Sequence, residues 1–138
     1  MPGPGVRPAD GQRRRRDRGT VTLELAILFP VLLSLTFGAI QVGLWYSART
    51  MCQAAAEAGT RAAKIHNAPA GSGAAAANGY LAAVAGGLVV GPAVTEGRTA
   101  TTVNVRCVGQ AQNVLPLPGL SIGVEQSATA GIERFSTR

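Results

Sequence analysis

The sequence predicts an α+β membrane-anchored protein: a long N-terminal transmembrane helix extends outside the membrane and is followed by a small antiparallel β hairpin or sheet head. Two observations lead to this fold class. Residues 25–46 form a run of 22 without a charge, and a helix of that length rises about 33 Å, enough for a bilayer core of about 30 Å. Two later segments, 99–108 and 120–132, alternate apolar and polar side chains as half-buried strands do.

The first 19 residues hold most of the positive charge. Six arginines against Asp10 and Asp17 give this segment +4 of the formal +6. Because it is rich in proline and glycine and poor in apolar residues, we expect it to be disordered. Arginines directly before a first membrane segment hold that end in the cytoplasm. Residues 1–19 are therefore predicted to be a basic cytoplasmic leader, and no nucleic-acid partner is expected.

Residues 20–47 are predicted to be the transmembrane helix and residues 48–66 its extracytoplasmic extension. Trp45 and Tyr46 close the apolar run, and such amphipathic rings favour the headgroup zone. Polar residues then recur at helical spacing: Arg49, Gln53, Glu57, Arg61 and Lys64. The predicted location is the plasma membrane, crossed once, with lipid as a partner. The N-terminus is expected in the cytoplasm and the C-terminal region outside.

Small residues recur four apart inside the membrane run, at Ala39, Gly43 and Ser47. This spacing lets two helices approach closely in lipid, so the three residues are candidates for helix packing. The alternative is an alanine-rich helix that forms through propensity alone.

Residues 67–138 are predicted to be a small α/β extracytoplasmic head. A short helix is expected over 74–85, ended by Gly86 and Gly87. The two alternating segments should pair across a long irregular connection, with 88–94 as a candidate third strand. Because two strands alone are marginal in water, the outer half of the long helix should cover their apolar face. The side chains expected on that face of the first strand are Thr101, Val103, Val105 and Cys107.

Little in the sequence points to catalysis. The carboxylates beyond the membrane run lie on different predicted elements, and His66, the single histidine, stands at a helix end. No nucleophile–base set, phosphate-binding glycine loop or metal-ligand spacing is present in the sequence. We therefore predict no enzymatic activity, no cofactor and no metal site.

The two cysteines, Cys52 and Cys107, are both expected outside the cytoplasm, where disulfides persist. A bridge would attach the first predicted strand to the helix, and it requires Cα atoms within about 7 Å. Cys52 follows Tyr46 closely, so a sheet that stays clear of the headgroups would not reach it. The sequence leaves both alternatives open.

One stretch resembles a known family. Gly19-Thr-Val-Thr-Leu-Glu24, followed by the apolar run, resembles a class III prepilin signal. The continuation through Pro30 and Gly38 to the alanine-rich segment 53–63 resembles TadE-like minor pilins of tight-adherence (Flp-type IV) pilus systems. The resemblance covers about residues 19–65, and beyond them only the general plan of a small strand-containing tail is similar.

The resemblance implies a function in pilus assembly. A prepilin peptidase would cut between Gly19 and Thr20, and the released helix would pack with other pilin or pseudopilin subunits on the pilus assembly platform. It also implies a place in a pilus at the cell surface. The leader of this chain is longer and richer in proline and glycine than the shortest leaders of such systems.

Glu24 is the residue that we expect to act in assembly. A charged, unpaired carboxylate at the edge of the hydrocarbon costs roughly 2 kcal/mol or more. Before cleavage it can extend its side chain to the interface. After cleavage the Thr20 amine would supply a positive partner, on the same subunit or on a neighbour.

Two other functions remain open from the sequence. The helix could be only an anchor for an extracytoplasmic binding module without a pilus role, or it could be cleaved from a secreted protein. The mature N-terminus separates the three: Thr20 for a pilin, Met1 for the anchor, and a residue beyond Ser47 for the secreted form.

Overall fold

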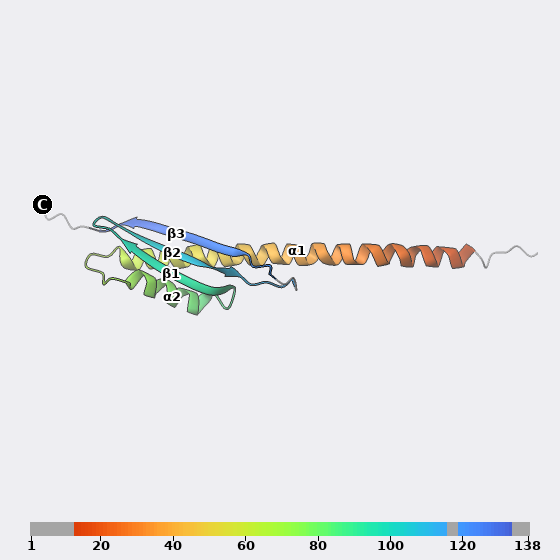
Figure 1. Cartoon of the computed structure of the whole chain (residues 1–138), viewed down its shortest axis with the longest axis horizontal. Coiled ribbons are helices and arrows are strands. Elements are labelled where there is room, and N and C mark those ends of the chain that lie inside the picture. Colours follow the sequence, from red (N-terminus) through yellow and green to blue (C-terminus); the bar gives the residue numbers. More distant parts are fainter. Residues whose placement is uncertain (1–12, 116–118, 134–138) are drawn as a thin grey trace, which may run out of the picture. The chain divides into compact units, whose positions relative to one another are not determined.

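The computed structural model describes residues 13–115 and 119–133, with side chains from residue 21 onward. The described residues form two helices and a three-stranded sheet, which are labelled in Figure 1. The elements are α1 (Arg13–Ala63), α2 (Ser72–Val84), β1 (Val89–Arg98), β2 (Thr102–Ala111) and β3 (Gly123–Gly131). This confirms the predicted α+β fold class. The chain divides into two compact units, Met1–Phe37 and Gly38–Arg138.

Helix α1 begins earlier than expected. Residues 13–19, for which we predicted disorder, belong to the helix. Arginine has a high helix propensity, and the single interior glycine, Gly19, costs only about 1 kcal/mol relative to alanine. The rest of the predicted leader, residues 1–12, lies outside the described residues. At its other end α1 stops at Ala63, slightly before the expected end of the extension.

Helix α1 presents an exposed apolar surface in its N-terminal half. Segment Val21–Ala63 of α1 is long and apolar enough to cross a membrane once, and its most apolar part is almost entirely exposed. Ser34 Oγ donates a hydrogen bond to the carbonyl of Pro30 at 2.7 Å, and Thr36 Oγ1 donates one to Leu32 at 2.9 Å. These polar side chains are therefore satisfied within the helix. The surface is consistent with single-pass membrane anchoring.

The second unit is the head, built from two layers. The strands are antiparallel in the order β1-β2-β3, and both helices contribute to one core with a single face of the sheet. Val103, Val105 and Cys107 of β2 are fully buried, as their alternation predicted. The opposite face carries polar pairs, including Arg106 with Glu125 at 2.7 Å.

Small residues set the spacing of the two helices. A Cβ added at Gly59 of α1 would lie 2.6 Å from the carbonyl oxygen of Gly73, and one at Gly73 would lie 2.9 Å from that of Gly59. Ala63 and Ala77 complete this contact. The composition thus gives a core that depends on close backbone approach and contains few large side chains.

The strand boundaries differ from the sequence predictions in physically clear ways. The candidate third strand exists and extends to Arg98 as β1. Thr101, expected to face the core, is instead exposed in the turn between β1 and β2. The β1–β2 register shifts between Val90 and Ala93, where Gly91 has φ 58° and Pro92 has no N–H to donate to the ladder.

Candidate functional site

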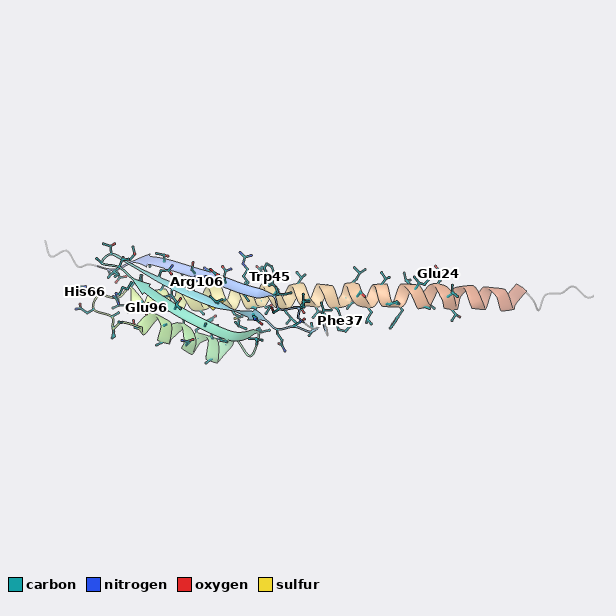
Figure 2. The ribbon with its side chains drawn as sticks, viewed as in Figure 1. Glu24, Phe37, Trp45, His66, Glu96 and Arg106 are labelled. Carbon is teal, nitrogen blue, oxygen red and sulfur yellow. A yellow bond between two sulfur atoms is a disulfide. The ribbon has the colours of Figure 1, made fainter. Side chains whose placement is uncertain are left out.

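The predicted processing position lies within α1. Gly19 and Thr20 are both helical. Glu24 follows one turn later, and its exposed carboxylate extends from the helix (Figure 2). Its neighbours Val21, Leu23 and Leu25 are each more than half exposed. An acidic group therefore stands alone in an apolar stretch of sequence, because the next charged residue along the chain is Arg49.

The three small residues predicted for helix packing do not face the head core. Ala39 and Gly43 are exposed, and a Cβ built on Gly43 would meet nothing within 4 Å. Ser47 is half-buried and donates its hydroxyl to the Gly43 carbonyl at 2.9 Å. The head instead packs on another face of α1, through Ala48, Cys52 and Ala55. The Ala39–Gly43–Ser47 side is left open for a second helix.

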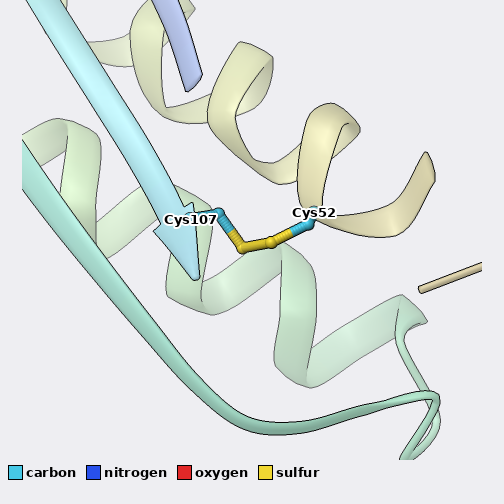
Figure 3. The surroundings of a disulfide bond; sticks show 2 residues. All are labelled: Cys52 and Cys107. Atoms are coloured by element: carbon cyan, nitrogen blue, oxygen red, sulfur yellow. A yellow bond between two sulfur atoms is a disulfide. The ribbon is translucent and has the colours of Figure 1, made fainter. Parts of the chain in front are cut away.

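Cys52 and Cys107, whose pairing the sequence left open, form a disulfide that joins α1 to β2 (Figure 3). Their Cα atoms are 5.5 Å apart, and both side chains are fully buried. The sheet therefore extends along α1 as far as Cys52, although this residue follows Tyr46 closely in the sequence.

Gln41 connects the head to α1 still closer to the membrane segment. It is 4% exposed. Its Nε2 donates to the Gln112 carbonyl at 3.2 Å, and its Oε1 accepts from the Val114 N–H at 3.1 Å. From the sequence alone we did not single out Gln41, which lies inside the uncharged run 25–46. The overlooked signal was that an amide in such a run needs partners for both of its ends.

Two hollows border α1 on the head. A shallow groove of about 530 Å³ is lined by α1 side chains between Tyr46 and Glu57 and by Gln126 of β3. A second hollow, of about 330 Å³, is almost entirely apolar and is lined by Gly38, Gln41, Val42, Trp45, Leu115, Leu120 and Ile122. Beside it, the Arg49 guanidinium lies 5.6 Å from the centre of the Trp45 ring, a cation–π distance.

The carboxylates of the head serve structural contacts. Glu96 of β1 accepts hydrogen bonds from the N–H groups of Gly73 and Ala74 at 2.8 and 3.2 Å, which caps the first turn of α2. Glu133 pairs with Lys64 at 3.1 Å, and Glu57 lies 3.9 Å from Arg61. Within the described part of the chain, no group of three or more histidine, cysteine, aspartate or glutamate side chains could hold a metal ion.

Comparison with known proteins gives one match. Residues 19–61 match the family model described as TadE-like protein. The match confirms the resemblance inferred from the apolar run and the alanine-rich segment that follows it, and the processing signal stays a prediction. No curated protein and no solved structure matches the chain.

Proposed function

We propose that this chain, TadE-like over residues 19–61, is a minor pilin that acts in the assembly of a tight-adherence (Flp-type IV) pilus. The observation that carries the proposal is the exposed apolar surface of α1 with one carboxylate, Glu24, near its start. A helix of this kind can lie in lipid and can also pack against other helices.

The proposed mechanism begins in the membrane. The arginine-rich leader keeps the N-terminus in the cytoplasm, and a prepilin peptidase removes it after Gly19. The new Thr20 amine then pairs with a Glu24 carboxylate, on the same subunit or on a neighbour. Because a charge pair is stronger at low dielectric than in water, this contact sets the depth of the helix among its partners.

The proposed partners are other pilin or pseudopilin subunits, the peptidase and the pilus assembly platform. The open Ala39–Gly43–Ser47 side of α1 supports helix–helix packing, since the head leaves it uncovered. In this role the protein initiates, caps or primes a pilus at the cell surface. It binds no nucleic acid and has no enzymatic activity.

The structure favours the retained helix over a secreted form. Cleavage beyond Ser47 would remove Gln41, whose side chain holds the backbone at Gln112 and Val114. It would also remove Trp45, which packs against the core. A membrane-anchored binding module is the second candidate, and the groove between Tyr46 and Glu57 would be its binding surface.

The test uses Gly19→Leu and Glu24→Ala, with Glu57→Ala as a matched control because Glu57 is an exposed carboxylate on the same helix. We expect Gly19→Leu to keep the mass of the uncut chain. Glu24→Ala should insert in the membrane but be depleted at least tenfold in sheared surface fractions, whereas Glu57→Ala should be recovered like the parent. An intact Met1 in the parent, together with normal recovery of Glu24→Ala, would refute the pilin function and support the anchored module.

A further inference from the structure

We propose that the head itself binds the membrane surface, through an apolar patch that enters the outer leaflet beside α1. We call this patch the lipid seat. It consists of Trp45, Val114, Leu115, Leu120 and Ile122. This inference concerns a contact of the head with lipid and does not depend on the pilin function.

The lipid seat has the composition of a buried surface. The connection from Gln112 to Val124 contains no charged residue. Val114 and Leu120 are 40% and 39% exposed, and Leu115 and Ile122 are half-buried at the rim of the apolar hollow. Surface loops are usually polar, and an apolar patch beside a hollow marks a surface that a partner covers.

Position along the chain identifies that partner as lipid. The hollow is lined on the helix side by residues between Gly38 and Trp45, and in the sequence Gly38 follows directly after the run of exposed apolar residues that ends at Phe37. The chain has no charge between Glu24 and Arg49. Trp45 with Arg49 over its ring is the pair expected at the headgroup level. Along the chain, the helix residues of the lipid seat therefore follow soon after the segment that is apolar enough to cross a membrane.

Several backbone groups in the described parts of the connection, on either side of 116–118, are satisfied by side chains. Irregular backbone is tolerated near hydrocarbon only when its polar groups are satisfied internally. Gln41 satisfies the Gln112 carbonyl and the Val114 N–H. Asn113 donates to the Leu120 carbonyl at 2.7 Å and accepts from the Leu115 N–H at 3.0 Å. These four bonds satisfy backbone groups beside the lipid seat that would otherwise require water.

The experiment places a fluorescent reporter on the patch. The chain has a single tryptophan, so Trp45→Phe creates a background in which Leu120→Trp supplies the only tryptophan, which is excited selectively over tyrosine at long wavelength. The full chain is reconstituted in phosphatidylcholine–phosphatidylglycerol nanodiscs that hold one copy each and contain phosphatidylcholine brominated at a shallow or a deep acyl position. Ile65→Trp is the matched reference, because Ile65 is exposed and lies beside His66 at the other end of the head (Figure 2). A mobility shift on reduction, from the Cys52–Cys107 disulfide, verifies that each variant has folded.

We expect bromolipid to quench Leu120→Trp at least twofold more than Ile65→Trp, and the shallow bromines to quench more than the deep ones. In the parent background, Leu120→Asp should shift the Trp45 emission to longer wavelength, and Ile65→Asp should not. If Leu120→Trp is quenched by aqueous iodide and not by bromolipid, the patch faces water and the proposal fails. If it is shielded from both quenchers, protein covers the patch and the proposal also fails.

Discussion

At the scale of single residues, two glycines decide how closely the helices of the head approach. A Cβ at Gly59 would lie 3.0 Å from Val105 Cγ1 and 3.1 Å from the Ala77 Cβ, besides its conflict with the Gly73 carbonyl. Backbone cannot move away as a flexible side chain does. The short distance therefore requires α1 and α2 to separate, which would open the core around Val105.

We expect Gly59→Ala to destabilise the head by about 1–3 kcal/mol, the usual cost of overpacking. The control is Gly79→Ala in α2, where an added Cβ meets nothing within 4 Å. That substitution should be neutral or stabilising by up to about 1 kcal/mol, because alanine has the higher helix propensity. Thermal unfolding of the full chain in nanodiscs, followed by circular dichroism, measures both. Equal melting temperatures for the two variants would contradict the close-packing argument.

At the scale of elements, periodicity was enough to predict most of the fold. The alternation around Val103 and Val105 predicted β2 because every second side chain had to be buried. The start of α1 was misplaced because composition suggested disorder where arginines extend the helix. The cap that Glu96 provides for α2 could not be predicted, since it depends on which strand lies beside that helix end. The Gln41 contact, likewise, joins residues far apart in sequence.

The pairing of Cys52 with Cys107 was left open for a related reason. It depends on how far the sheet extends along α1, which local sequence does not specify. The bridge closes a separation of 55 residues, and removal of a native disulfide typically costs about 2–5 kcal/mol. Because the core otherwise contains mostly small side chains, this contribution is a large part of the stability of the head.

We predict that the double variant Cys52→Ala/Cys107→Ala unfolds at a clearly lower temperature than the oxidised parent, with a loss of about 2–5 kcal/mol. Reduction of the parent with dithiothreitol should lower the melting temperature similarly, and it should leave the double variant unchanged. Indistinguishable melting of oxidised and reduced parent would show that the bridge adds no stability.

At the scale of the whole molecule, the head contacts define where the lipid-facing helix ends. Gln41 and Ala48 are buried. If α1 crosses the membrane, as we propose, this side of the helix is not available to lipid, and hydrocarbon contact there would end before Gln41. Residues 21–40 remain, and as a helix they rise about 30 Å, which equals the hydrocarbon thickness. In this proposal Gln41 lies at the outer border of the hydrocarbon, where a polar amide is tolerated.

This border is testable by labelling with a membrane-impermeant maleimide on intact cells. Ala39 and Thr50 are both exposed on α1, so they form a matched pair. We expect Thr50→Cys to react and Ala39→Cys to stay unlabelled until detergent is added. Labelling of Ala39→Cys on intact cells would show that the outer border of the hydrocarbon lies before residue 39. Reaction of Thr50→Cys only in inverted vesicles would show that residue 50 lies on the cytoplasmic side, opposite to the proposed orientation.

The disulfide has a consequence for the timing of export. With the head outside, as proposed, Cys52 would leave the membrane soon after the helix inserts, and Cys107, 55 residues later in the sequence, would follow only after the intervening chain had crossed. The bond can therefore form only after β2 has emerged. Its oxidation state would therefore record whether β2 of an individual chain has crossed, and chains halted before that point would be trapped as free thiols.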